Sequence, residues 1–406
     1  MRWSRIRNSI RSTRGRRWAL GYLKVLVIVA IFSSFLANDR PILASYAGEI
    51  RFPVFREIGE IFSGPRPYGD LPGRSWRKAE TDWAVWPPVR YSAGELDFAN
   101  NNYVSPFEEQ KIETALERHW LGTDQLGRDT LAGLIRGCRI ALLVGMVAMG
   151  IALLIGLLMG GLAGFFSNDG LRAHRHRAWS FAIGTVFGII YLINNFLPYA
   201  NGWSGWIKYP AAFIVFAGLL GLFQLLFGFP ASFWPWWRKE ISLPIDAIVL
   251  RIIELFNSFP TLILLIAVLP VIDSPTILTV MLVIGLIRWT GIARFVRAEL
   301  LRIRQLPYID AARISGFGQL RILFRHALPN ALGPVVVALS FGVAGAILLE
   351  AYLSFLSIGL PEDQVSWGSL LQQSRAQPAA WWLAVFPGLA IFFTVLSLNV
   401  IGEAVR

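Results

Sequence analysis

The sequence predicts an all-α, polytopic membrane protein, and three observations lead to this fold class. The 406 residues are 55% hydrophobic and only 16% charged, whereas soluble domains carry about 25% charged residues. Apolar runs long enough to cross a bilayer recur along the chain. These runs lack the alternation of barrel strands, so helices must satisfy the backbone in lipid. The composition excludes a disordered chain, and the single cysteine, Cys138, excludes a disulfide-stapled scaffold.

The first predicted span follows a basic N-terminal segment. Residues 1–18 contain seven arginines and no acidic residue, and an apolar run, residues 19–37, follows at once. A cleaved signal peptide has an apolar region of about 7–15 residues and small residues at the cleavage site. This run is longer, and Phe35 stands where a small residue would be needed. We therefore predict an uncleaved first span with the N-terminus in the cytoplasm.

Seven further apolar runs bring the predicted number of spans to about eight. Each run is long enough to cross a hydrocarbon layer of roughly 30 Å as a helix that rises about 1.5 Å per residue. They comprise residues 140–166, 178–197, 211–229, 247–272, 276–295, 331–349 and 381–401.

The distribution of basic residues predicts the orientation of these spans. Of the 38 basic residues, 33 are arginine, and they cluster beside the apolar runs, which favours membrane orientation over nucleic-acid binding. With the N-terminus inside, the basic loops are all cytoplasmic: 167–177, 230–246 and 296–330. The short loops predicted to lie outside, 198–210 and 273–275, contain Lys208 as their only basic residue. Both termini are therefore predicted to be cytoplasmic. Residues 38–139 are predicted to form a long extracytoplasmic segment, which is folded and rich in loops. Segments of this length are exempt from the positive-inside rule, by which basic residues stay in the cytoplasm.

The loop 296–330 has the pattern of a short helix at the cytoplasmic surface. Pro307 ends the incoming helix, and Asp310 lies in the first turn of a new one, where negative charge suits the helix dipole. Ala311 and Ala312 remove side-chain bulk from one face. Gly316 can supply the left-handed residue that ends the helix.

Pro329 marks a second break, before the next span. The short helix would then lie among arginines and would be suited to insert into a groove on a cytoplasmic partner. A solvated basic loop that only obeys the positive-inside rule is the alternative. The spacing alone leaves both interpretations open.

A resemblance adds to this interpretation. Asp310-Ala311-Ala312, Gly316 and Leu328-Pro329 together resemble the motif through which importer-type ABC permeases couple to their ATPases, with Asp310 in place of the usual glutamate. Four further blocks resemble permeases of binding-protein-dependent dipeptide and oligopeptide importers: residues 119–129, 349–360, 366–368 and 381–382.

The resemblance covers about residues 119–166 and 243–406, the latter being the permease core with the coupling loop 296–330. Residues 38–107 are similar to a longer extracytoplasmic stretch in some members of the family. Residues 167–242 depart from it, because they hold two extra spans where the family has a short turn. An inserted pair preserves the orientation of everything downstream.

The resemblance implies a non-catalytic subunit of a bacterial inner-membrane importer for peptides. None of the five lysines lies in a phosphate-binding Gly-x-x-x-x-Gly-Lys-Ser/Thr loop, so ATP and Mg²⁺ would be bound by partner chains and this chain would need no cofactor. The implied partners are two cytoplasmic ATPase subunits, a homologous second permease, an extracytoplasmic solute-binding protein and membrane lipid. Neither a metal site nor nucleic-acid binding is expected.

Three of the charged residues within or beside the spans are candidates for a role in the pathway, because charge there is costly and tends to be paired. We hypothesise that Glu254 and Arg288, near the cytoplasmic ends of adjacent spans, pair at an inner gate; snorkelling to the interface is the alternative. Glu350 either faces the pathway or holds the loop that follows it.

Two rival functions are open to such a sequence. A proton-coupled secondary carrier would require buried acidic relays and internal repeats, and the spans offer few candidates beyond Glu254. An intramembrane enzyme would require a catalytic set, which the sequence lacks. The sequence does not fix the substrate, since dipeptides, oligopeptides, peptide antibiotics and nickel chelates are all handled by similar permeases.

Overall fold

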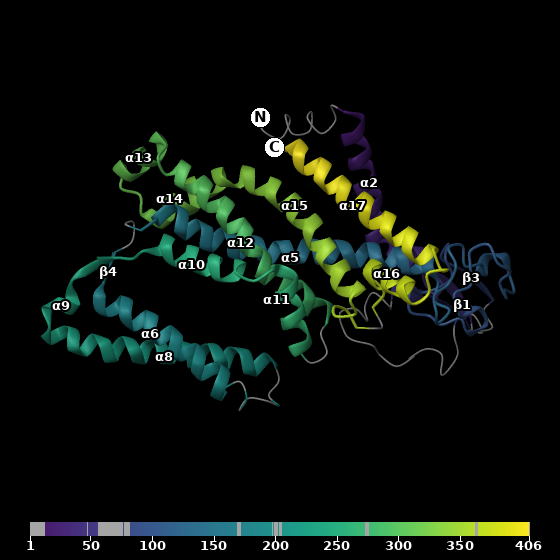
Figure 1. Ribbon diagram of the computed structural model, residues 1–406, viewed down its shortest axis with the longest axis horizontal. Coiled ribbons are helices and arrows are strands. Elements are labelled where there is room, and N and C mark those ends of the chain that lie inside the picture. Colours follow the sequence, from purple (N-terminus) through teal and green to yellow (C-terminus); the bar gives the residue numbers. More distant parts are fainter. Residues whose placement is uncertain are drawn as a thin grey trace. The chain divides into compact units, whose positions relative to one another are not determined.

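The computed structural model describes residues 13–46, 48–55, 76, 82–168, 172–196, 198, 202, 205–272, 276–361 and 364–405 (Figure 1). Helices dominate it, as predicted. The chain divides into two compact units. Unit 1 consists of Met1–Leu158, Leu255–Glu299 and Leu328–Arg406, and unit 2 consists of Met159–Glu254 and Leu300–Ala327.

Six helices in the described residues are long and apolar enough to cross a membrane. Two of them combine adjoining elements. The helix α6 (Arg175–Tyr191) continues into the π turn η4 (Leu192–Phe196). The helix Gln319–Phe355 contains α14 (Gln319–Ile322), the π turn η6 (Leu323–Ala327) and α15 (Leu328–Phe355). The remaining four are α5 (Thr130–Phe166), α8 (Gly205–Phe233), α12 (Ile277–Ile303) and α17 (Trp382–Val405). The prediction of an all-α, polytopic membrane protein is confirmed.

The prediction that residues 247–272 form one continuous helix is wrong. It forms α10 (Ile245–Asn257) and α11 (Thr261–Val268), followed by the short η5 (Leu269–Val271), with a bend of 77° at the break. Pro260 lies at the break, where it lacks an N–H to donate and disfavours a helical conformation for the residue before it. Counting this bent pair as one span gives up to seven.

The first predicted span is helical over most of its length. It forms α2 (Arg14–Ile31) and the short α3 (Ser33–Leu36). Four basic residues lie within α2, so it is less apolar than the six helices above. The count of eight spans stays a prediction.

The helix α5 begins ten residues before the apolar run that predicted it. The carboxylate of Asp129 accepts a hydrogen bond from the backbone N–H of Ala132 at 2.6 Å, which satisfies one of the free donors at the helix start. Residues 130–139, predicted as part of the extracytoplasmic segment, therefore belong to a helix. Hydrophobicity locates the part of a helix that can lie in lipid, and this helix extends beyond it.

Residues 38–129, called here the 38–129 segment, are folded and rich in loops where they are described. A three-stranded antiparallel sheet has the order β2 (Glu49–Arg51), β1 (Leu43–Tyr46), β3 (Trp83–Val85). Two 3-10 turns follow, η2 (Phe98–Asn100) and η3 (Ala115–Glu117). The indole N–H of Trp382 donates to the carbonyl of Thr123 at 3.0 Å, which ties the segment to α17.

Gly127 allows two backbone stretches of this segment to meet. Its φ is +83°, and a Cβ added there would overlap the carbonyl of Asp97. Gly48 has a similar φ of +80° but nothing within 4 Å of an added Cβ. We expect Gly48→Ala to destabilise the protein by about 1 kcal/mol and Gly127→Ala by at least about 2 kcal/mol, because it adds a clash with backbone. Thermal unfolding of the detergent-solubilised chain measures both, and equal shifts would contradict the close approach.

The core of unit 1 forms where α2, α5, α15 (Leu328–Phe355), α16 (Trp367–Ala376) and α17 meet. Trp367 is fully buried there, and its indole N–H donates to the carbonyl of Leu134 in α5 at 3.0 Å. The hydroxyl of Tyr22 in α2 donates to the carbonyl of Ala390 in α17 at 3.2 Å. The first helix is thus packed against the last.

In unit 2, the helices α6 and α8 of the inserted pair lie side by side (Figure 1). The strands that flank the pair, β4 (Arg172–His174) and β5 (Glu240–Ser242), form an antiparallel ribbon. The guanidinium of Arg175 lies 4.0 Å above the ring of Trp236, which precedes β5. Because the ribbon brings the two ends of the insert together, the pair extends from the chain as a hairpin.

Candidate functional site

The short helix predicted in the loop 296–330 is present as α13 (Pro307–Ile314). Pro307 occupies its first position, where the missing N–H leaves no hydrogen bond unmade. Asp310 lies in the first turn and accepts a hydrogen bond from Arg313 at 3.1 Å. Both side chains are exposed, so this ion pair contributes at most about 1 kcal/mol. The predicted start of the helix and the place of Asp310 are confirmed.

Gly316 ends α13 in the way predicted. Its φ is +78°, its N–H donates to the carbonyl of Arg313, and the N–H of Phe317 donates to the carbonyl of Ala312. These two bonds form a Schellman motif, which requires a left-handed residue that glycine adopts without strain. The chain is thereby turned back toward α14 (Gln319–Ile322).

The two faces of α13 differ from the prediction. Ala312 and Ile309 are buried within unit 2, whereas Ala311 is exposed. The expectation that Ala311 and Ala312 share one small face is wrong, because consecutive helical residues point about 100° apart. The small side chain of Ala312 allows α13 to pack closely within unit 2. The small side chain of Ala311 leaves the exposed face of the helix without bulky groups.

The exposed side of this region carries large apolar side chains. Ile314 is 88% exposed, and three further apolar residues beyond Gly316 are also exposed. We call these four residues the α13–α14 surface: Ile314, Phe317, Leu320 and Phe324. Within it, the Arg321 guanidinium lies 4.7 Å from the Phe317 ring centroid, and His326 stacks on the same ring at 5.9 Å. The loop that bears the surface is therefore held by ring contacts. Ile314 and Phe317 lie outside the helices that can cross a membrane, and exposed apolar side chains that cluster at such a place mark an interaction site.

Leu328 and Pro329 begin α15 without the predicted break. The helix continues from Gln319 to Phe355, and the turn before Leu328 is the π turn η6 (Leu323–Ala327). A proline in a regular helix clashes with the carbonyl four residues earlier, here that of Arg325. The wider π turn is one way to accommodate it. The sequence correctly located an irregularity but assigned it the wrong form.

The structure gives different neighbours to Glu254 and Arg288. Glu254 forms a salt bridge of 2.8 Å with Arg251, three residues earlier, and both of these side chains are largely exposed. The guanidinium of Arg288 lies against Gly345 of α15, within unit 1. Glu254 belongs to unit 2, and the predicted Glu254–Arg288 pair stays a prediction. Sequence reasoning missed Arg251, although its spacing from Glu254 is that of neighbours on one helix face.

Glu350 is a buried residue of α15, and its carboxylate faces the start of α16. The hydroxyl of Ser354 donates to its carboxylate at 2.7 Å, and Ser366 also hydrogen-bonds to it. Ser366 is at the same time the N-cap of α16 and forms a capping box with Ser369. This geometry favours the hypothesis that Glu350 holds the loop that follows it.

A second buried polar cluster surrounds His119 in the 38–129 segment. Its Nδ1 lies 2.8 Å from the carboxylate of Asp129 and its Nε2 lies 3.1 Å from that of Asp97, and the ring stacks on Tyr91 at 4.1 Å. Burial alone would lower the pKa of His119, but the two carboxylates outweigh it and raise that pKa above its ordinary value. Burial would raise the pKa of Asp97, but hydrogen bonds from Asn100 and His119 lower it.

The partners of His119 lie ten residues after it and 22 residues before it. The block 119–129 contains both His119 and Asp129, but no local pattern connects them with Asp97, so the cluster could not be recognised before the fold was known. In the part of the chain that the structure describes, no three His, Cys, Asp or Glu side chains are grouped as they would be to hold a metal ion.

Comparisons with known proteins agree with this architecture. A family model described as "Binding-protein-dependent transport system inner membrane component" matches residues 236–406. The chain is 28% identical to the peptidoglycan transport system permease protein YejE of Agrobacterium fabrum, over 98% of this chain and 90% of the relative. It is also 28% identical to the inner membrane ABC transporter permease protein YejE of Escherichia coli, over 100% and 94% of the two chains. That alignment runs through residues 167–242, so the inserted pair lies inside the aligned region.

A third relative, from Brucella suis, is named as a peptide permease protein. It is 30% identical over 71% of this chain and 72% of its own length.

Proposed function

This chain belongs to the family of binding-protein-dependent transport system inner-membrane components, the permeases of ABC importers of the peptide type, and we propose that it is the permease subunit of an ATP-driven importer for peptides. In this role it forms part of the translocation pathway in the bacterial inner membrane, with both termini in the cytoplasm. Two separate ATPase subunits bind ATP and Mg²⁺, a homologous second permease completes the pathway, and a solute-binding protein delivers the substrate.

The observation that carries the proposal is the α13–α14 surface. A rigid helix with a defined start and end presents Ile314 almost fully to solvent, outside the spans. An exposed apolar anchor surrounded by arginines is typical of an interface with another protein. Docking of an ATPase on this surface transmits nucleotide-driven closure to α12 and α15, the helices that flank it in sequence, and so shifts the permease between its inward- and outward-facing states.

The substitution Ile314→Asp tests this coupling. The side chain makes few contacts within the chain, so the variant is expected to fold and insert normally. In the assembled importer it is expected to lose about 2 kcal/mol of subunit binding, or roughly thirtyfold in affinity for the ATPase chains, and peptide-stimulated ATP hydrolysis should fall with it. Ile50→Asp is the matched control, since Ile50 is also exposed but lies in β2 of the 38–129 segment.

Equal loss in the two variants, or none in either, would contradict the assignment of the coupling surface. Uptake of peptides by proteoliposomes that contain this chain alone, driven by a proton gradient, would instead support a secondary carrier and contradict the proposed function. The substrate class is tested in the same system, by ATP-dependent uptake of labelled di- and oligopeptides.

A further inference from the structure

Arg288 lies near the middle of α12, in a stretch that is otherwise apolar. It is the only charged residue between Ile277 and Ala293. Arg288 follows Ile277, the first residue of α12, by 11 positions. Its guanidinium lies against Gly345, which precedes Phe355, the last residue of α15, by 10 positions. At about 1.5 Å per residue, both positions are about 15–17 Å from these helix ends, or half of a hydrocarbon layer of roughly 30 Å.

The helices pack closely around this charge. A Cβ added at Gly285 of α12 or at Gly342 of α15 would overlap atoms of α5, so both helices approach α5 closely. Three residues further along each helix, the Arg288 guanidinium fills the space beside Gly345. A Cβ added at Gly345 would overlap Nη2 of Arg288 and lie 3.3 Å from its Cζ. The guanidinium is therefore held against a helix, whereas snorkelling to the interface serves residues near helix ends.

The guanidinium of Arg288 has no polar partner among the described residues. Within that part of the chain it forms neither a hydrogen bond nor an ion pair, although a guanidinium has five N–H donors and stays charged. Glu254, the partner that the sequence suggested, forms its salt bridge with Arg251. The Arg288 side chain is partly exposed, so a group from outside the chain can reach it.

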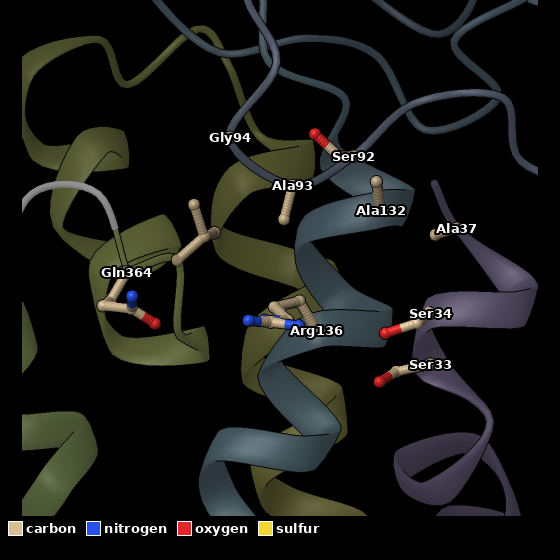
Figure 2. Close-up of a pocket in the computed structure, with 10 residues that line it drawn as sticks. Ser33, Ser34, Ala37, Ser92, Ala93, Gly94, Ala132, Arg136 and Gln364 are labelled. Atoms are coloured by element: carbon tan, nitrogen blue, oxygen red, sulfur yellow. The ribbon is translucent and has the colours of Figure 1, made fainter. Parts of the chain in front are cut away.

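A second arginine near a span differs from Arg288 in this respect. Arg136 lines a cavity of about 190 Å³ at the start of α5, and it already interacts with a neighbour within the chain. Figure 2 shows its side chain extending from α5 toward the side where Gln364 lies. Arg136 therefore has a partner in the chain, whereas Arg288 has none among the described residues.

The depth of Arg288 and its lack of a partner indicate what meets its charge. Charged residues inside a membrane almost always face the helix bundle or a water-filled cavity, and they mark the paths of substrates and ions. A planar guanidinium matches a carboxylate, to which it donates two parallel hydrogen bonds. We propose that Arg288 is a charge-selective residue of the translocation pathway, where it binds the carboxylate of a peptide in transit. This inference rests on the proposed function, which makes peptides the solutes of the pathway.

The test compares the wild-type importer with Arg288→Met, assembled with its partner subunits in proteoliposomes that contain ATP on the side of the ATPase chains. Methionine keeps an unbranched apolar side chain and removes the charge. The measured quantity is the uptake rate of labelled dialanine divided by that of dialanine amide, which lacks the carboxylate. Because both importers use the same solute-binding protein, its own preference cancels. We expect the ratio to fall at least about tenfold in Arg288→Met, through the loss of charge-assisted hydrogen bonds.

Two further variants show whether charge selection belongs to this position. Arg288→Lys keeps the charge but cannot donate two parallel bonds, so it should restore part of the ratio. Arg294→Met is the matched control, because Arg294 is an exposed arginine of the same helix that lies beside the end of the apolar run. It should leave the ratio at the wild-type value.

Gly345→Asp tests the missing counter-charge without any transport. Its carboxylate would lie beside the Arg288 guanidinium, whereas Gly345→Ala adds only the Cβ. In nanodiscs of neutral phosphatidylcholine, Gly345→Asp is expected to melt at a higher temperature than Gly345→Ala. In the Arg288→Met background the order should reverse, because the carboxylate is then left unpaired. A lower melting temperature for Gly345→Asp in both backgrounds would show that Arg288 already has a partner, and would overturn the inference.

The uptake assay separates failure of this inference from failure of the proposed function. Equal ratios in the wild type and Arg288→Met would overturn the inference and leave the proposed function intact, since both importers would still take up peptides. Loss of the second permease when Arg288→Met is purified would assign the arginine to the subunit interface and would overturn it as well. Absence of ATP-dependent peptide uptake by the wild-type importer contradicts the proposed function, and the peptide carboxylate as the ligand of Arg288 falls with it.

Discussion

Replacing His119 by leucine is expected to lower the free energy of unfolding by about 3–5 kcal/mol, because it leaves two carboxylates without their cationic partner in a buried cluster. The imidazole lies within hydrogen-bond distance of Asp129 and Asp97 and is itself fully buried. Leucine has a similar volume but offers no donor. The cluster joins the start of α5 to the loop that precedes η2, so its loss should loosen the 38–129 segment first.

The effect of His119→Leu is also expected to depend on pH. The pKa of His119 is raised above its ordinary 6.5 in the folded chain, so its contribution to stability is fully present below pH 6.5 and is lost as the pH rises through the raised value. The pKa of Asp97 is lowered from 3.8, so its contribution is present above pH 3.8 and is lost at lower pH. The destabilisation by His119→Leu should therefore be greatest between these two values and shrink in alkaline buffer.

Thermal or denaturant unfolding of the detergent-solubilised chain, repeated across this pH range, measures both effects. His176→Leu serves as the control, since the His176 ring hydrogen-bonds to the carbonyl of Trp237 and is not seen to meet a carboxylate within the described residues. It should destabilise the chain by about 1 kcal/mol, well below the effect expected of His119→Leu. A loss below about 1 kcal/mol for His119→Leu between pH 3.8 and 6.5, where the effect is expected to be greatest, would show that the cluster is not held as an ion pair.

The start and end of α13 could be predicted because their signals are local. A proline can occupy the first position of a helix, an acid suits its first turn, and a glycine can adopt the left-handed conformation at its end. Pro307, Asp310 and Gly316 meet these requirements within ten residues. The long spans could be predicted for a similar reason, since hydrophobicity is a property of each segment by itself.

Two kinds of feature could not be predicted: those that depend on packing, and the backbone conformation that the chain adopts around a proline. The inward orientation of Ala312 depends on what α13 packs against. The helix pair at Pro260 is bent by 77°. At Pro329 the helix continues after a π turn, although a proline is present at both places.

Truncating Trp367 to alanine is expected to destabilise unit 1 by about 3–5 kcal/mol. The side chain is fully buried where α2, α5, α15 and α17 meet, so its removal leaves a cavity among these helices. The variant would also leave the carbonyl of Leu134 without the indole N–H that it accepts from at 3.0 Å. Because Trp367 follows the cap residue Ser366 directly, its loss should also weaken the connection between α15 and α16 through Glu350.

Two further variants separate packing from hydrogen bonding at this position. Trp367→Phe keeps most of the aromatic packing and removes the N–H, so it should cost about 1–2 kcal/mol. Trp120→Ala removes a tryptophan that is largely exposed, and its effect should stay within about 0.5 kcal/mol. Melting temperatures of the three variants in detergent, and their yield in the membrane, should therefore fall in the order Trp120→Ala, Trp367→Phe, Trp367→Ala. If Trp367→Ala were no worse than Trp367→Phe, the burial of this ring would not be what holds the helices of unit 1 together, and the hydrogen bond to Leu134 would account for the effect.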